Sequence, residues 1–167
     1  MIFFVIELKT RAVHVAGIRV NPDSRWLMQV TRNLLDPDTG FLRDARYLVH
    51  DRDPLYTKAW AELLRTSNVK SAPIPASSPN CNPYAERFVR TIRTECLNHF
   101  VIFGERHLRV LLREFCTHYN EERFHQGLGG QLIRPAVSAR NDKGLSGTVK
   151  CRSRLGAMLN FYHREVA

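Results

Sequence analysis

The sequence lacks the features expected of a membrane protein or a disulfide-stabilised secreted protein. No apolar run approaches the roughly 20 residues that a membrane-spanning helix needs. The apolar start, residues 1–6, has no basic segment and is soon interrupted by charges, so it predicts a strand and not a signal peptide. The four cysteines form no CxxC pair, and no histidine is spaced to complete a zinc site. We therefore expect reduced thiols in a cytoplasmic protein that has no membrane partner.

The composition is that of a folded protein with an excess of positive charge. The chain has 167 residues, 44% of them hydrophobic and 25% charged, which suits one domain with a core and excludes a disordered tail. The net charge is +9, which attracts polyanions, and nucleic acid is the commonest of these. Charge alone leaves open a basic surface with no special partner.

Strand and helix patterns alternate along the chain. Strands are expected at 2–8, 12–20, 46–50 and near 69–72, and helices at 24–36, 57–66, 83–100, 105–121 and 153–165. This order predicts an α/β fold in which helices pack on a mixed sheet. The strand at 46–50, the next helix and the strand near 70 form a βαβ unit.

The apolar run Tyr47–Val49 is followed after one residue by an acid, Asp51, with a second acid at Asp53. Functional groups collect at strand ends in α/β sheets, and Mg²⁺ is usually held by one or two carboxylates with water and phosphate. Asp51 is therefore a candidate metal ligand. Aspartate is also common in turns after strands, so a purely structural role stays open for both acids.

A third acid, Glu86, lies one turn into a helix that Asn82 is expected to cap. Arg90 and Arg93 follow at helical spacing on the same face. A carboxylate for metal beside guanidinium groups for phosphate suits phosphodiester chemistry. The alternative is a surface helix whose Glu–Arg pairs only solvate it.

Several stretches together resemble the integrase catalytic core of bacterial insertion-sequence transposases, which are related to retroviral integrases. They are "VIELKTRAVHVAG", "LVHDRDPLYT", "PASSPNCNPYAERFVRTIRTECL" and "HYNEERFHQGLGGQLIRPA", within about residues 2–137. Asp51 matches the second catalytic acid, Asp53 stands where a glycine is frequent, and Glu86 matches the catalytic glutamate. The last stretch carries a YN-x-x-R-x-H-x-x-L pattern at Tyr119, Asn120, Arg123, His125 and Leu128.

The resemblance implies a ribonuclease-H-like fold and a D-D-E triad that binds two divalent ions, Mg²⁺ or Mn²⁺. Asp51 and Glu86 would be metal ligands. Arg90 and Arg93 would contact DNA phosphates, with Arg123 and His125 as weaker candidates. For His125 a structural role in a tight segment is favoured.

The resemblance also implies a missing part. The family's first catalytic Asp lies on a central first strand, upstream of the segment that matches residues 2–8. Glu7 is the only acid in the two opening strands, and nothing in the sequence shows that it can substitute. We therefore expect an N-terminally truncated core, residues 1–137, which either pairs strand 2–8 with strand 46–50 or folds poorly. Residues 138–167 would be a C-terminal extension with a short helix.

Three functions remain open from the sequence. The leading one is a transposase core for metal-dependent DNA strand transfer, inactive alone and acting with further copies or with full-length transposase. The alternative is a non-catalytic basic fragment that binds DNA or the transposase. A metal-dependent phosphatase that uses Asp51 and Asp53 is a third reading, disfavoured by the context of residues 119–135.

Overall fold

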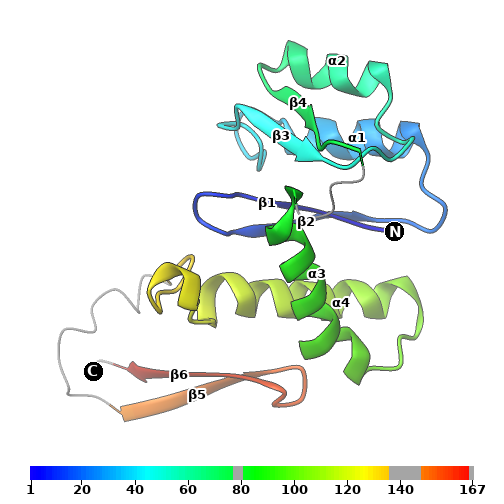
Figure 1. Cartoon of the computed structure of the whole chain (residues 1–167). Helices are drawn as coiled ribbons and strands as arrows, with labels where there is room; N and C mark the ends of the chain where they lie inside the picture. The colour runs from blue at the N-terminus through cyan, green and yellow to red at the C-terminus, as the bar shows by residue number, and fades with distance from the viewer. Residues whose placement is uncertain (77–80, 136–147, 166–167) are drawn as a thin grey trace. The chain divides into compact units, whose positions relative to one another are not determined.

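A computed structural model describes residues 1–76, 81–135 and 148–165 (Figure 1). The chain divides into two compact units. The first unit contains Met1–Phe4 and Ala16–Arg87, and the second contains Val5–Val15 and Phe88–Ala167. In its described part the chain is a mixed α/β protein with small sheets and four α-helices.

The first unit is built around a βαβ element. Its elements are α1 (Ser24–Leu34), β3 (Tyr47–His50), α2 (Lys58–Thr66), β4 (Lys70–Pro73) and the start of α3 (Pro83–Glu95). Strands β3 and β4 are parallel, with Tyr47 opposite Lys70 and His50 opposite Pro73. Because α2 connects them, the predicted strand–helix–strand unit is confirmed.

Side-chain caps and an interhelical hydrogen bond explain why α1 and α2 form where they do. The Asp23 carboxylate accepts from the Trp26 amide at 2.8 Å, and the Thr57 hydroxyl accepts from the Trp60 amide at 3.2 Å. The buried Trp60 indole donates to the Thr31 hydroxyl at 2.8 Å, which joins the two helices. The polar end of this large core side chain is therefore satisfied.

An N-terminal hairpin contributes residues to both units. Its strands are β1 (Ile2–Ile6) and β2 (Val13–Ile18). The Arg19 amide donates a hydrogen bond to the Met1 carbonyl, and the Glu7 amide donates one to the Ala12 carbonyl. These hydrogen bonds show that the two strands run antiparallel. Only a residue without a side chain fits at Gly17, because a Cβ there would lie 2.7 Å from the Trp26 ring.

The second unit packs helices against a second hairpin. It contains most of α3, helix α4 (Gly104–Thr117), a π-helical turn (His118–Glu122) and the strands β5 (Thr148–Arg154) and β6 (Leu159–Glu165). Short 3₁₀ turns cover Leu97–His99 and Gln126–Leu128. The buried apolar side chains of its described part are Val5, Ala12, Val13, Phe88, Ile92, Cys96, Leu111, Leu112, Phe115, Leu159 and Phe161.

One prediction about the sheets is wrong, and one of two alternatives left open by the sequence is not observed in the described part of the chain. The described strands form three separate two-stranded sheets and not one mixed sheet, and β1 pairs with β2 while β3 pairs with β4. The pairing of strand 2–8 with strand 46–50 is therefore not observed within the ranges that the structure describes. Local partners prevail here, since a hairpin and a βαβ unit each satisfy one edge of both strands.

The helix predicted at 153–165 is also wrong, because this segment contains the end of β5, the turn and the second strand of the β5–β6 hairpin. The residues Leu155, Gly156 and Ala157 have φ values of 51°, 68° and 66°, which end any helix. After this turn, Leu159 and Phe161 are buried while Asn160 and Tyr162 are exposed. That alternation of two residues is the period of a strand.

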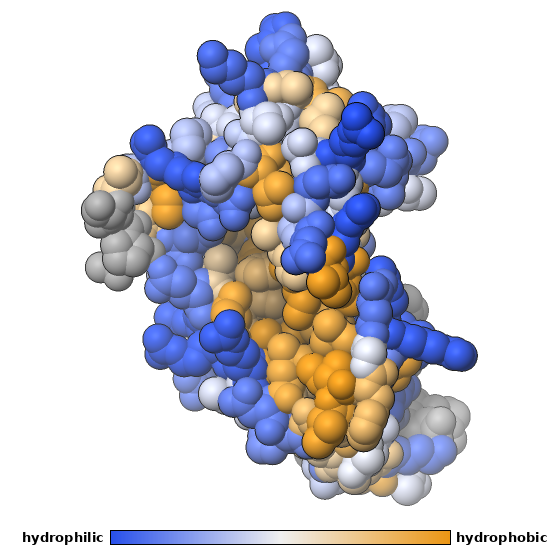
Figure 2. Space-filling model, turned by 90° about the vertical axis from the view of Figure 1, so that its right-hand side faces the viewer, coloured by the Kyte–Doolittle hydropathy of each residue, from blue (hydrophilic) through white to orange (hydrophobic). Residues whose placement is uncertain are grey.

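Not all apolar surface is buried. Figure 2 shows apolar side chains gathered on one face. In the connection between α3 and α4, Val101 is 73% exposed and Phe103 is 77% exposed. Among the described helices, none has the length and apolar character to cross a membrane.

Candidate active site

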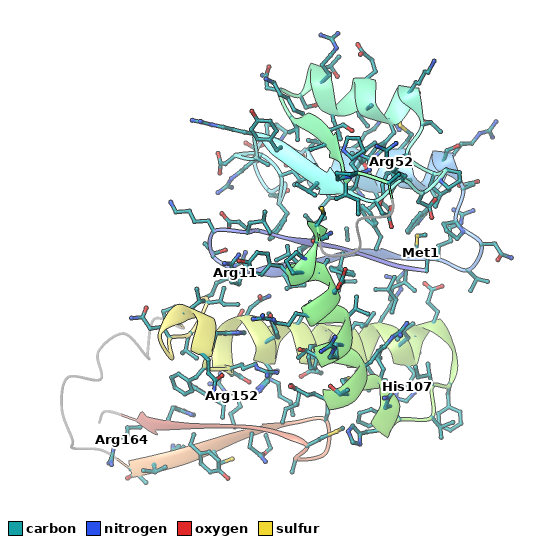
Figure 3. The ribbon with its side chains drawn as sticks, viewed as in Figure 1. Met1, Arg11, Arg52, His107, Arg152 and Arg164 are labelled. Atoms are coloured by element: carbon teal, nitrogen blue, oxygen red, sulfur yellow. The ribbon has the colours of Figure 1, made fainter. Side chains whose placement is uncertain are left out.

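Asp51 comes directly after the last residue of β3, and its side chain is exposed. The backbone around it is held from several directions. The Ile74 amide donates to the His50 carbonyl at 2.9 Å, and the Arg52 guanidinium donates to the Ile74 carbonyl at 2.9 Å (Figure 3). The strand end is therefore fixed while the Asp51 carboxylate stays accessible.

The Asp53 carboxylate, unlike that of Asp51, is used in a backbone turn. One of its carboxylate oxygens accepts from the Leu55 amide at 2.8 Å. Its own amide donates to the Asp51 carboxylate at 3.3 Å, a long contact. The two bonds form the turn after β3, so the structural alternative explains the position of Asp53. Asp51 keeps most of its acceptor capacity for a ligand.

His50 lies behind Asp51 and is only 9% exposed. Its Nδ1 is 2.6 Å from the Asp51 carbonyl oxygen, and its Nε2 is 2.8 Å from the Ser71 hydroxyl on β4. The ring centroid is 4.4 Å from that of Tyr56 and 4.9 Å from that of Trp60. Burial lowers the pKa of His50 and outweighs the opposing contact and charge of Asp51, so the ring is neutral at pH 7.

Tyr56 closes the same aromatic cluster, with its ring centroid 4.6 Å from that of Trp60. Burial raises the pKa of Tyr56, and the negative charges of Asp51 and Asp53 raise it further. The phenol is therefore protonated across the physiological pH range. The end of β3 thus has a neutral, aromatic side and an acidic, exposed side.

Glu86 is the acid in the first turn of α3, and its side chain is exposed. The expected cap is present but weak, because the Asn82 side chain accepts from the Ala85 amide at 3.4 Å. A carboxylate in a first helical turn is stabilised by the helix dipole. Both Asp51 and Glu86 belong to the first unit.

The two carboxylates supply the donor chemistry for a hard cation such as Mg²⁺ or Mn²⁺. No group of three or more His, Cys, Asp or Glu side chains is placed to hold a metal ion in residues 1–76, 81–135 and 148–165. A metal at this site would therefore rest on Asp51, Glu86 and ligands from water or substrate.

The four predicted DNA contacts differ in their surroundings. Arg90 and Arg93 are exposed on α3. Arg123 forms an ion pair with Glu95 and lies over the Tyr119 ring, with 5.8 Å from its guanidinium carbon to the ring centroid. These partners compete with any phosphate for Arg123. Arg90 and Arg93 thus present their charge to solvent more openly than Arg123 does.

His125 is held inside the segment that follows the π-helical turn. Its Nε2 is 2.8 Å from the Tyr119 carbonyl oxygen, and its ring centroid is 4.7 Å from that of Tyr119. Its backbone amide bonds the Gln131 carbonyl at 3.0 Å. These contacts account for a structural role, while its contact with DNA stays a prediction.

The same segment contains an amide clamp that the sequence did not reveal. The Asn120 side chain accepts from the Val13 amide at 2.9 Å and donates to the Val13 carbonyl at 2.8 Å. The Asn120 carbonyl also accepts from the Arg134 amide at 2.7 Å. Asn120 is part of the YN-x-x-R-x-H-x-x-L pattern, but a single sequence does not indicate that its side chain hydrogen-bonds to β2.

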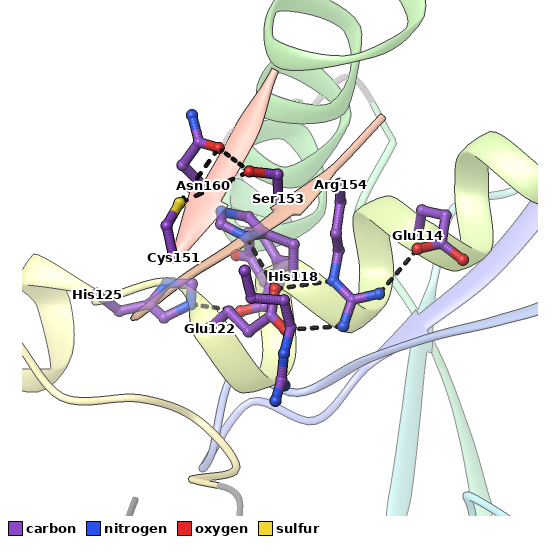
Figure 4. Close-up of polar contacts among 10 residues, drawn as sticks. Glu114, His118, Glu122, His125, Cys151, Ser153, Arg154 and Asn160 are labelled. Atoms are coloured by element: carbon purple, nitrogen blue, oxygen red, sulfur yellow. Dashed lines mark hydrogen bonds and ion pairs between the residues drawn. The ribbon is translucent and has the colours of Figure 1, made fainter. Parts of the chain in front are cut away.

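A second missed feature is a buried carboxylate, Glu122, in a cluster of charges (Figure 4). Arg154 of β5 binds both oxygens of Glu122 at 2.7 and 2.8 Å and binds Glu114 at 2.8 Å. Arg152 and His118 each approach Glu122 at 3.3 Å. Burial alone would raise the pKa of Glu122, but the hydrogen bonds and charge of Arg154 outweigh it and lower the pKa. The cluster fastens the β5–β6 hairpin to the end of α4.

The sequence was compared with known protein families and curated proteins. The integrase core domain family matches residues 67–132, a range that contains Glu86 and all four candidate DNA contacts but not Asp51. No curated protein matches the chain. Integrase core domains usually use divalent metals and bind DNA, and such a match indicates a function of the DNA-integration type. Residues 67–132 are therefore integrase-core sequence, of the kind that belongs to the catalytic core of integrases and transposases.

Proposed function

We propose that this chain is part of the catalytic core of an insertion-sequence transposase and acts in metal-dependent DNA strand transfer. The observation that carries the proposal is the position of two exposed carboxylates in a chain with an integrase-core match. Asp51 lies at the end of β3, and Glu86 lies in the first turn of α3 inside the matched range. In this proposal the chain has a ribonuclease-H-like fold and the protein acts in the bacterial cytoplasm.

Asp51 and Glu86 would hold a Mg²⁺ or Mn²⁺ ion, whose chemistry is to activate the attacking oxygen and stabilise the leaving one. The protein's own contribution is placement. The β3–β4 pairing and the turn at Asp53 fix Asp51, and the α3 backbone fixes Glu86. The exposed guanidinium groups of Arg90 and Arg93 would bind DNA phosphates without reading sequence.

Strand transfer in this proposal needs a third acid in addition to Asp51 and Glu86. The family's first catalytic Asp has no counterpart in the motifs that match this chain, so the chain alone is expected to be inactive. A full-length transposase would supply the missing acid, and further copies of the chain would act only as partners in the assembly. Residues 1–137 would form the core, and 138–167 would form an extension fastened through Arg154.

The test combines Mn²⁺ binding with Mn²⁺-dependent nicking of supercoiled DNA, with and without full-length transposase. Asp51→Asn and Glu86→Gln should each weaken Mn²⁺ binding and abolish any nicking that the chain supports. Asp53→Asn and Glu105→Gln are matched controls, because Asp53 serves the turn and Glu105 pairs with Arg109 on the surface. Unchanged Mn²⁺ binding and nicking in both site variants would refute the assignment.

A non-catalytic DNA-binding role is the second candidate. It is favoured by the net charge of +9 and by the exposed Arg90 and Arg93. DNA binding that weakens steeply with salt and needs no divalent ion would support it. The phosphatase reading is less favoured, because the Asp53 carboxylate already caps the Leu55 amide.

A further inference from the structure

We propose that His50 is the positioning residue for Asp51, because it holds the Asp51 carbonyl and thereby sets where the carboxylate points. This inference rests on the proposed role of Asp51 as a metal ligand. His50 itself is buried against Ser71, Tyr56 and Trp60.

The two hydrogen bonds of His50 fix which nitrogen carries the proton. The Asp51 carbonyl oxygen, 2.6 Å from Nδ1, can only accept, so Nδ1 must donate. Nε2 is then the unprotonated nitrogen and accepts from the Ser71 hydroxyl at 2.8 Å. The Asp51 carbonyl thus selects the tautomer, and the Ser71 hydroxyl, which can donate or accept, anchors the other ring nitrogen from the neighbouring strand β4.

The imidazole ring is fixed by packing as well as by hydrogen bonds. It packs against both Tyr56 and Trp60, which also contact each other, and Trp60 is only 1% exposed and hydrogen-bonded to Thr31 of α1. Rotation of the ring would therefore disturb the core that α1 and α2 share. The Asp51 carbonyl is connected through one side chain to the rigid part of its unit.

Without His50, the residues around Asp51 would have weaker restraints. The bond from the Asp53 amide to the Asp51 carboxylate is long, at 3.3 Å. The Ile74 and Arg52 contacts hold the residues on either side of Asp51 and not its own carbonyl. A metal site needs its ligands held to within about 0.5 Å, and loss of an outer partner typically costs about 10- to 100-fold in metal affinity. We expect an effect of that order for loss of the His50–Asp51 bond.

Two substitutions separate the positioning role from simple packing. In His50→Asn the side-chain amide nitrogen falls near the place of Nδ1 and can still donate to Asp51. In His50→Gln the amide group falls near the place of Nε2 and keeps contact with Ser71 only. Both variants lose the same ring contacts with Tyr56 and Trp60. Their thermal unfolding should therefore shift by similar amounts.

The experiment measures Mn²⁺ affinity by electron paramagnetic resonance on the full chain and both variants. His50→Gln should bind Mn²⁺ about 10-fold or more weakly, and His50→Asn should stay within about 3-fold of the wild type. A ¹⁵N–¹³C coupling between Nδ1 and the Asp51 carbonyl gives a readout that needs no metal. If both variants bind Mn²⁺ equally, or the coupling is absent in the wild type, the positioning role is overturned.

Asp51→Asn separates this failure from that of the proposed function. If Asp51→Asn leaves Mn²⁺ affinity unchanged, Asp51 is no ligand and both proposals fall. If it weakens binding while the two His50 variants behave alike, only the role of His50 falls. If a His50 variant does not fold, Ser71→Ala serves as the alternative test. It removes the hydrogen-bond partner of His50 Nε2 and should weaken Mn²⁺ binding several-fold.

Discussion

Replacing Arg154 with methionine should lower the free energy of unfolding by about 3 kcal/mol. Arg154 is bidentate to Glu122, with bonds of 2.7 and 2.8 Å, and the Glu122 side chain is only 1% exposed. Removing one partner of a buried pair usually costs about 3–5 kcal/mol. The lower end applies because Arg152 and His118 stay near Glu122 at 3.3 Å.

The loss should depend on pH. In the wild type the pKa of Glu122 lies below its ordinary value of 4.5, so its contribution is full above that value and is lost as pH falls through the lower folded pKa. In Arg154→Met, burial is no longer outweighed, and the pKa of Glu122 should rise. As pH falls, Glu122 is therefore protonated at a higher pH in the variant than in the wild type, which removes the unpaired buried charge. The difference in stability should therefore shrink between about pH 7 and pH 4.

Urea unfolding followed by circular dichroism at pH 7 and pH 4 measures both effects. Arg113→Met is the matched control, because Arg113 pairs with Glu114 at 3.2 Å but is 69% exposed. It should cost no more than about 0.5 kcal/mol. An Arg154→Met variant that loses no more stability than Arg113→Met would show that the buried pair does not hold the hairpin.

Three further predictions concern separate parts of the chain. Asn120→Ala leaves the amide and carbonyl of Val13 without partners and should cost about 2–4 kcal/mol in urea unfolding, whereas a loss below 1 kcal/mol would contradict the clamp. Thr57→Ala removes the α2 cap and should cost about 1 kcal/mol, and Thr57→Ser should restore most of it. Burial raises the pKa of Cys96 to about 11 and of Cys116 to about 12, so at pH 8 a thiol reagent should label these far more slowly than exposed cysteines; equal rates would refute their burial.

Features that depend on neighbouring residues could be predicted from the sequence. The α2 helix has its cap at Thr57 and its buried residues Trp60 and Leu64 at helical spacing, and the structure has it at Lys58–Thr66. The strands on either side of α2 were predicted to within a residue or two. Such signals lie within one element, so one sequence contains them.

The hairpin β5–β6 shows where that reasoning fails. Apolar residues from Leu155 to Phe161 can be read with a helical or a strand period, and helix was the wrong choice. The deciding factors are the left-handed turn and the pairing of Arg152 with Phe161 across the strands. Neither can be predicted from a single sequence, because a positive φ is uncommon for non-glycine residues such as Leu155 and Ala157.

The acidic residues of the candidate site were predicted from the sequence, but the hydrogen bonds that hold Asp51 in place were not. Asp51 and Glu86 were singled out because a carboxylate after a strand, or beside arginines on a helix, has a chemical signature. His50 ends an apolar strand and gave no sign of its bonds to Asp51 and Ser71. Its partner on β4 is 21 residues away, and only the parallel pairing brings the two together.

The Asn120 clamp has a consequence for how the chain is made. Val13 and Asn120 are 107 residues apart, so during synthesis β2 leaves the ribosome long before its partner exists. At about 5–20 residues per second, this delay is on the order of 5–20 s. During that time the Val13 amide and carbonyl must bond water, and the strand edge is open to other chains. Strand β2 is thus completed only when the integrase-core segment, residues 67–132, is nearly finished.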